Sequence, residues 1–129
     1  MDDRLIALAN ARNRLAEVAS ADLDAPFVLD AAIQRFEFTY ELAWKTLRRA
    51  LRERVPDDRL DGISRSELFH LGVEEGLIEN ASQWLAFHEG RNLTSHLYRE
   101  ETARTVAALC APLSESVTFL LSRLNGDSS

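Results

Sequence analysis

Apolar residues recur at spacings of three and four along most of the chain, which is the pattern of α-helices with one buried face. The widest apolar stripe predicts a helix over about 26–54 that stops before Pro56. A stripe of this width is typical of a helix packed against two neighbours. Its positions are Ile33, Phe36, Tyr40, Ala43, Leu47 and Leu51, with Phe38, Leu42 and Trp44 widening it.

Signals for the start and end of helices divide the rest of the chain. Asp24, with Pro26 just behind it, is a good start for the second helix. Ser64 and Glu67 are spaced as a capping box, and Asn80 can cap the helix that follows it. The helices predicted in this way cover about 2–20, 26–54 and 65–76, a stretch that begins after Asn80, and about 99–124.

The last predicted helix contains Pro112. Because a proline inside a helix removes a hydrogen bond and clashes with the preceding turn, we expect a kink near residue 108. Five helices without strands predict the all-α class, in the form of an up-and-down bundle. We expect 1–124 to be a single domain, followed by a frayed tail over 125–129.

The composition excludes several classes of protein. Hydrophobic residues make up 46% and charged residues 28% of the 129 positions, which is the balance of a soluble globular protein. A single cysteine allows neither an intrachain disulfide nor a zinc site built from cysteines. We expect no apolar run of transmembrane length and no signal peptide, so the sequence predicts a cytoplasmic protein without a membrane partner.

The segment that follows Gly90 concentrates polar chemistry. A histidine can give and take a proton near neutral pH, and an arginine can bind phosphate through two parallel hydrogen bonds. Together they suffice, without a metal ion, for attack of an RNA 2′-hydroxyl on its own phosphate. The polar members of the segment are Arg91, Asn92, Thr94, Ser95, His96 and Tyr98.

The spacing within this segment leaves a structural alternative open. Five positions along an ideal helix place Arg91 and His96 about 140° apart, whereas Asn92 and His96 share a face. An irregular backbone at Gly90, or a second copy of the chain, would be needed to complete a site. The alternative is a polar helix end at which His96 acts as a C-terminal cap.

Elsewhere the residues favour structural roles. There is no glycine-rich loop of the kind that cradles phosphate. Trp44 and Trp84 are expected to anchor the core, and Cys110 lies on an apolar stripe where it would be a small core residue. His88 is expected to be a solvated or capping group near a helix end.

Two motifs point to a known family. The stretch 34–47 and the stretch 84–98 resemble the nucleotidyltransferase substrate-binding protein family, a branch of the HEPN (higher eukaryotes and prokaryotes nucleotide-binding) superfamily close to the HepT toxins. The resemblance implies a homodimer of four- or five-helix HEPN-like bundles. It also implies a toxin–antitoxin pair, in which a minimal nucleotidyltransferase of the MNT type is the antitoxin. RNA would be the substrate, and no cofactor or metal is expected.

The resemblance also implies roles for single residues. HEPN toxins are metal-independent endoribonucleases with an Arg-x4–6-His motif, and Arg91, Asn92 and His96 fill its places here. Arg91 would stabilise the phosphate, Asn92 would orient it, and His96 would be the general acid/base. Tyr98 occupies the position of the tyrosine that the partner adenylylates to silence the toxin. The alternatives are a non-catalytic subunit that presents substrate to a nucleotidyltransferase or regulates it, and a plain helical interaction protein.

The basic residues are unevenly spread along this acidic chain. The net charge of −6 argues against a general nucleic-acid coat. The stretch from Arg35 to Arg54, however, contains six basic residues and only three acidic ones. Arg48, Arg49 and Arg52 are therefore candidate contacts for RNA or for an acidic partner. A solvated helix end, favoured by the helix dipole, explains the same residues equally well.

Overall fold

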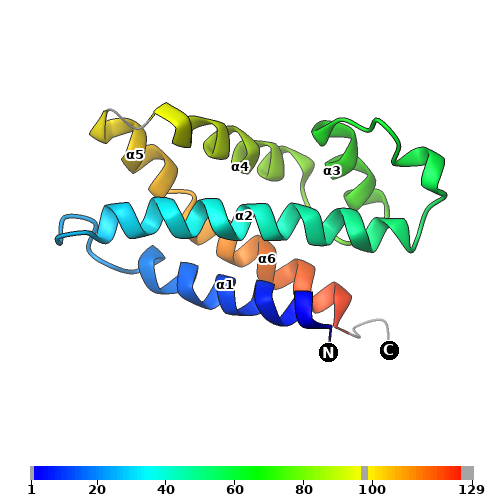
Figure 1. Ribbon diagram of the computed structural model, residues 1–129, viewed down its shortest axis with the longest axis horizontal. Coiled ribbons are helices and arrows are strands. Elements are labelled where there is room, and N and C mark those ends of the chain that lie inside the picture. Colours follow the sequence, from blue (N-terminus) through cyan, green and yellow to red (C-terminus); the bar gives the residue numbers. More distant parts are fainter. Residues whose placement is uncertain (1, 97–98, 126–129) are drawn as a thin grey trace.

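The longest helix, α2 (Val28–Arg52), packs against all five other α-helices. In Figure 1 it runs along the length of the molecule, with α1 and α6 on one side and α3 and α4 on the other. The computed structural model describes residues 2–96 and 99–125, and within them it contains only helices, so the predicted all-α bundle is confirmed. The other elements are α1 (Asp3–Ala19), η1 (Asp57–Arg59), α3 (Arg65–Glu74), α4 (Ala81–Leu93), η2 (Thr94–His96), α5 (Glu100–Ala107) and α6 (Cys110–Leu124), where η marks a short 3-10 helix.

The predicted helix starts are confirmed where a polar side chain caps the helix. The Ser64 side chain accepts from the backbone N–H of Glu67, whose carboxylate accepts from the backbone N–H of Ser64, both at 3.1 Å. Asn80 accepts from the backbone N–H of Gln83 at the start of α4. Each cap satisfies backbone donors that the first helical turn leaves without a partner.

The start of α2 differs from the prediction. Its capping residue is Phe27, which has a left-handed backbone (φ 68°) and makes no side-chain cap hydrogen bond. Asp24 instead pairs with Arg104 of α5, so it joins two elements and does not begin a helix. A left-handed backbone is unfavourable for a bulky residue, and the Phe27 side chain is 84% exposed.

The predicted last helix is two helices. α5 ends at Ala107 and α6 begins at Cys110, which puts the break at the position expected for the kink. Pro112 is the third residue of α6. In the first turn of a helix a proline costs no hydrogen bond, because the N–H groups there have no partner within the helix. The proline therefore marks the start of a new helix and not a bend within one.

The C-terminal segment corrects the expectation about membrane-spanning runs. Glu100–Leu124 is long and apolar enough to cross a membrane, by length and composition alone. In the bundle, however, many of its apolar residues belong to the core. Val106, Leu113, Val117 and Leu120 are all completely buried. Such burial is what the core helix of a folded domain shows.

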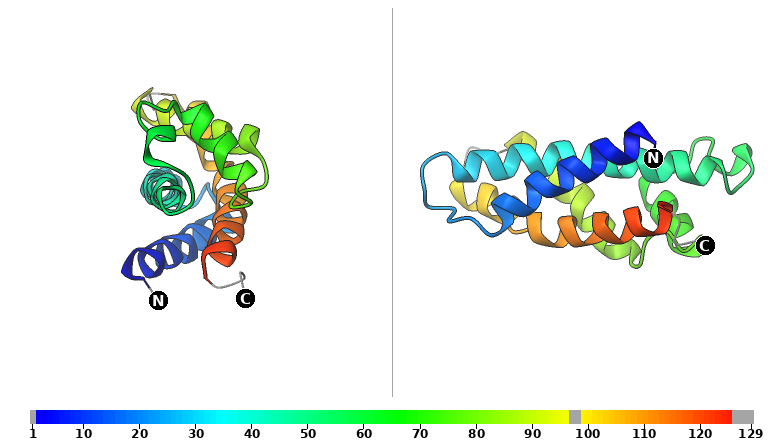
Figure 2. Two further views of the ribbon diagram at one scale, coloured as in Figure 1. Left: turned by 90° about the vertical axis from the view of Figure 1, so that its right-hand side faces the viewer. Right: turned by 90° about the horizontal axis from the view of Figure 1, so that it is seen from below.

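The core is built around α2 and confirms most of its predicted stripe. Trp84 and Cys110 are buried as expected. Two edges of the stripe are wrong, because Phe38 is 60% exposed and Trp44 is only partly buried. In the end-on view of Figure 2, helices lie along only part of the circumference of α2, which leaves part of its surface uncovered. The largest fully buried side chains include Trp84, Tyr40, Phe36, Phe69, Phe87, Leu8, Leu15, Leu47 and Leu51.

Candidate functional site

Arg91 lies near the end of α4, where two carboxylates of α2 hold its guanidinium. Nη1 lies 3.3 Å from Oε2 of Glu37, and Nε lies 3.3 Å from Oε1 of Glu41. Nη1 also donates to the hydroxyl of Thr94 at 2.9 Å. The three side chains of this ion-pair cluster are about one-third exposed, with 33% for Arg91. The arginine is therefore oriented before any ligand binds.

Two features of the sequence bring Arg91 to these carboxylates. Glu37 and Glu41 are four residues apart, so they lie one above the other on the same face of α2. Gly90 lets α4 approach closely, because a Cβ at this position would lie 2.4 Å from Leu109 Cδ1 and 3.2 Å from Phe36 Cζ. The helix runs unbroken through Gly90, so the irregular backbone considered for this position is not seen.

Glu41 is shared between Arg91 and Trp44. The indole Nε1 of Trp44 donates to Oε2 of Glu41 at 2.9 Å, which fixes the direction of the carboxylate. The other carboxylate oxygen of Glu41, Oε1, lies 3.3 Å from Nε of Arg91, but the two atoms do not have the geometry of a hydrogen bond. That Nε is the one buried side-chain nitrogen or oxygen of residues 2–96 and 99–125 that lacks a hydrogen-bond partner. This buried nitrogen is therefore compensated by the charge of Glu41 alone.

A second polar chain lies beside this cluster, between α2, α3 and α4. Arg65 donates to the hydroxyl of Tyr40 (3.3 Å), which lies 3.0 Å from Nδ1 of His88. Burial raises the pKa of Tyr40 to about 12, and the positive charge of Arg65 opposes that rise. Burial, and then the charge of Arg65, lower the pKa of His88. His88 is thus an internal hydrogen-bond partner, and the expectation that it is a solvated or capping group is wrong.

His96 and Asn92 are in a different environment. The α-helix ends at Leu93, and His96 is the last residue of the 3-10 turn η2. Both side chains are exposed, and neither makes a hydrogen bond or ion pair within the described residues. The change of helix type means that the angles of an ideal α-helix do not apply between Arg91 and His96. Tyr98 lies outside the described residues, as does most of the predicted tail over 125–129.

The candidate contacts Arg48, Arg49 and Arg52 line a single groove of about 450 Å³. Arg4 of α1 and Lys45 of α2 complete its charged lining, and the ring of Trp44 forms its apolar part. We call this feature the cationic groove. Trp44 thereby connects the groove to the ion-pair cluster through its hydrogen bond to Glu41.

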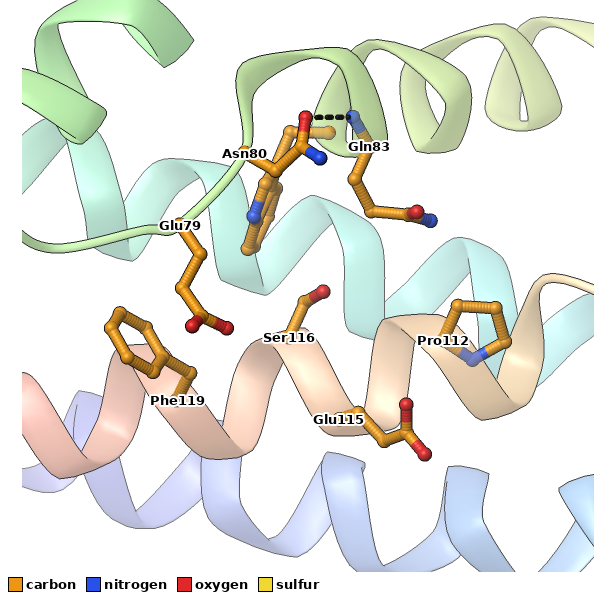
Figure 3. Close-up of a pocket in the computed structure, with 8 residues that line it drawn as sticks. Glu79, Asn80, Gln83, Pro112, Glu115, Ser116 and Phe119 are labelled. Atoms are coloured by element: carbon orange, nitrogen blue, oxygen red, sulfur yellow. Dashed lines mark hydrogen bonds between the residues drawn. The ribbon is translucent and has the colours of Figure 1, made fainter.

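Another groove, of about 410 Å³, lies between the start of α4 and α6 (Figure 3). Its two charged lining residues, Glu79 and Glu115, are both acidic. None of the predicted site residues within 2–96 and 99–125 lines it. Two carboxylates without a facing cation disfavour a phosphate ligand, so we do not assign the site to this groove.

Sequence reasoning missed Glu37 and Glu41 as partners of Arg91, and it named Thr94 only as a polar member of the segment. A signal was present for the two glutamates, because they lie four residues apart in the helix that carries the widest apolar stripe. Carboxylates placed between apolar positions of a packed helix require a cation opposite them. Which cation that is depends on how α4 lies against α2, and the sequence pattern does not give this.

Known proteins resemble the chain over most of its length. A curated protein of Haemophilus influenzae (strain Rd), named probable ribonuclease HepT, is 34% identical over 98 residues, covering 75% of this chain and 67% of the relative. The solved structure of HI0074 from the same species, described as the fold of a substrate binding domain of a nucleotidyltransferase, is 28% identical with a TM-score of 0.82. It matches over 94% of this chain and 98% of its own.

A second solved structure and a family model agree with these matches. The Thermus thermophilus protein ttk003001694 is 34% identical, with a TM-score of 0.78 over 91% of this chain and 98% of its own. The model of proteins described as nucleotidyltransferase substrate binding protein like matches residues 3–125, which include Arg91 and His96. The chain therefore belongs to the nucleotidyltransferase substrate binding protein family.

Proposed function

We propose that the protein is a HEPN-type endoribonuclease that uses Arg91, Asn92 and His96. The observation that carries this proposal is the fixed guanidinium of Arg91 in the same short segment as an exposed histidine. Nη2 of Arg91 makes no hydrogen bond or ion pair with the described residues, so it can donate to a phosphoryl oxygen. The relative named probable ribonuclease HepT supports the assignment.

The proposed reaction needs one proton carrier and one fixed cation. His96 takes the proton of an RNA 2′-hydroxyl, and the 2′-oxygen forms a bond to the adjacent phosphorus. The bond from phosphorus to the 5′-oxygen breaks, and that oxygen leaves with the electron pair and takes a proton from solvent. Arg91 offsets the negative charge that builds on the phosphoryl oxygens. The products are a 2′,3′-cyclic phosphate and a 5′-hydroxyl.

Regulation by adenylylation of Tyr98 is part of the same proposal. A separately encoded minimal nucleotidyltransferase would act as antitoxin and transfer AMP from ATP to the phenol, with release of pyrophosphate. Tyr98 follows His96 by two residues, so the added phosphate would bring negative charge close to the histidine. We further propose a homodimer, in which the exposed His96 segments of two copies form one RNA-binding site.

A specific observation favours a second candidate, a non-catalytic subunit that holds the substrate of a nucleotidyltransferase. Glu37 and Glu41 together neutralise Arg91, so its guanidinium has little net charge with which to offset the extra negative charge that builds on the phosphate during cleavage. The solved relative HI0074 is described as the substrate binding domain of a nucleotidyltransferase. In this candidate function the cluster would bind a nucleotide without cleaving RNA.

An RNA cleavage assay in EDTA separates the two candidates. The protein would be purified without its partner, and mass spectrometry would confirm that Tyr98 is unmodified. We expect cleavage of total tRNA or mRNA that leaves 2′,3′-cyclic phosphate ends and is lost in His96→Ala. No cleavage by the wild-type protein of either RNA would favour the substrate-binding subunit.

The regulatory tyrosine is tested by Tyr98→Phe. The variant keeps the ring but has no hydroxyl to accept AMP, so we expect it to cleave RNA even after incubation with the nucleotidyltransferase and ATP. The wild-type protein, treated in the same way, should gain one or more AMP groups and lose activity. Equal silencing of both proteins would contradict the modification model.

A further inference from the structure

We propose that the cationic groove of Arg4, Lys45, Arg48, Arg49 and Arg52 binds the phosphate backbone of single-stranded RNA, with Trp44 at the end that leads to Arg91. The choice of RNA as ligand rests on the proposed function. The assignment of the groove as a binding site rests on its charge, on its shape and on its connection to the ion-pair cluster.

The charge of the groove is strongly local. Five of the 15 basic residues line it, on a chain with a net charge of −6. Of these five, Arg49 alone has an ion pair within the part of the chain that the structure describes, at 4.0 Å from Asp2. Lys45, Arg48, Arg49 and Arg52 repeat at spacings of three and four on α2, and like charges at these spacings repel each other. An anionic ligand would remove this repulsion.

The helix dipole does not account for the groove. It favours Arg49 and Arg52, which lie in the last turn of α2. Lys45 lies before that turn, and Arg4 lies in the first turn of α1, where a cation is unfavourable. A solvated helix end would need neither of these two residues at this place. Their convergence on one groove points to a ligand with several negative charges.

Flat side chains extend the groove toward the site. The guanidinium of Arg65 lies 3.5 Å from the centre of the Trp44 ring, and both residues line a second hollow of about 220 Å³, which Arg48 also borders. Indole and guanidinium planes are surfaces on which unpaired bases stack, whatever their sequence. Arg65 covers one face of the indole, so the surfaces left for a base are the second face of Trp44 and the outer plane of the guanidinium. A basic track with such surfaces fits a single strand of RNA better than it fits the surface of an acidic protein.

The cationic groove and its extension at Arg65 contact both networks of polar side chains at the site. Trp44 donates to Glu41, which pairs with Arg91, and Arg65 donates to Tyr40, which contacts His88. A strand that lies on Trp44 and Arg65 is therefore two contacts away from Arg91. The groove would hold the RNA on one side of the cleavage position, and Arg91 would hold the phosphate at that position.

The test measures binding without cleavage. Fluorescence anisotropy would follow a short fluorescein-labelled 2′-O-methyl RNA, which lacks the nucleophilic hydroxyl and cannot be cut by the proposed reaction. The groove variant is Arg48→Gln/Arg49→Gln/Arg52→Gln. The matched control is Arg12→Gln/Arg14→Gln/Arg59→Gln, which loses the same charge outside the groove. Equal unfolding midpoints would show that all three proteins are folded.

We expect the groove variant to bind on the order of 100-fold more weakly than wild type at about 0.1 M salt, since each lost phosphate contact removes about 0.7 from the slope of log K against log salt. The control should stay close to wild type. Equal binding by groove variant and wild type would overturn the proposal, and so would equal loss in groove variant and control. The proposal would also be overturned, in favour of a protein interface, if the wild-type protein did not bind RNA but bound the nucleotidyltransferase through the groove arginines. Binding through the groove without cleavage of ordinary RNA would leave the groove standing and contradict the nuclease function alone.

Discussion

Arg91 and His96 are five residues apart in one motif, yet they have opposite surroundings. Arg91 lies in an α-helix and is held by Glu37, Glu41 and Thr94, whereas His96 lies in a 3-10 turn and is exposed. The difference matches the two tasks that the proposed chemistry assigns. Charge stabilisation gains from a donor fixed in advance, while proton transfer needs a group that the substrate can reach.

The comparison predicts that loss of His96 affects cleavage and not folding. In His96→Ala we expect RNA cleavage to fall by about 10²- to 10⁴-fold, the usual contribution of a general acid/base. The free energy of unfolding should change by less than about 0.5 kcal/mol, because the side chain is exposed and has no partner in the described chain. Single-turnover cleavage and urea denaturation measure the two effects. A large loss of stability would show that His96 is a structural cap.

Loss of Arg91 should affect both properties. In Arg91→Gln we expect cleavage to fall by about 10²- to 10³-fold, as for other donors that stabilise a developing charge. Two carboxylates would also lose their cation, and because the cluster is one-third exposed the cost in stability should be only about 1 kcal/mol. The same two assays apply. Unchanged stability would mean that the ion pairs do not form in solution.

Gly90→Ala should disturb the arginine and leave the histidine turn unchanged. The added methyl group would lie 2.4 Å from Leu109, between α5 and α6, and 3.2 Å from Phe36 of α2, so α4 would have to move away from both. We expect a loss of stability of about 1–3 kcal/mol, the usual cost of overpacking a core. Ser95→Ala, at an exposed position of η2, is the control and should stay close to wild type. A gain in stability would show that the Leu109 side chain moves aside and that the higher helix propensity of alanine dominates.

The smallest predicted effect concerns His88, the histidine of α4. The pKa of His88 is lowered in the folded protein by burial and by Arg65, so the unfolded chain binds more protons and stability falls with decreasing pH. The loss should begin near the ordinary histidine pKa of about 6.5 and continue through the lowered folded pKa. His88→Gln should reduce this pH dependence, as measured by urea midpoints at mildly acidic and neutral pH. An identical pH dependence in both proteins would contradict the assignment.

Local signals in the sequence predicted the helices well, but they did not predict the contacts between helices. The capping box at Ser64 and the cap at Asn80 depend on residues three apart, so spacing alone reveals them. The pair between Glu37 and Arg91 joins residues far apart in the chain and depends on how α4 lies against α2. The exposure of Trp44 has the same origin, because periodicity shows an apolar stripe but not how much of it a neighbouring helix covers.

The candidate site divides in the same way. Arg91, Asn92 and His96 could be named from the residue types that phosphate chemistry requires. Their environments could not be named, because the change from α-helix to 3-10 turn after Leu93 has no clear sequence signal. Gly90 was a visible signal, but the sequence suggested only that the backbone there could be irregular. Its role is to let two helices come close.

The unequal burial of the two tryptophans provides an optical readout that needs no label. Trp84 is 1% exposed in the core, while Trp44 is partly exposed beside the cationic groove. Acrylamide should therefore quench the emission of Trp44 first, and a stacked base should quench it in the absence of acrylamide. In Trp44→Phe the remaining emission would come from Trp84 and would follow unfolding alone. A single fluorescence titration can in this way separate a ligand that occupies the groove from one that disturbs the fold.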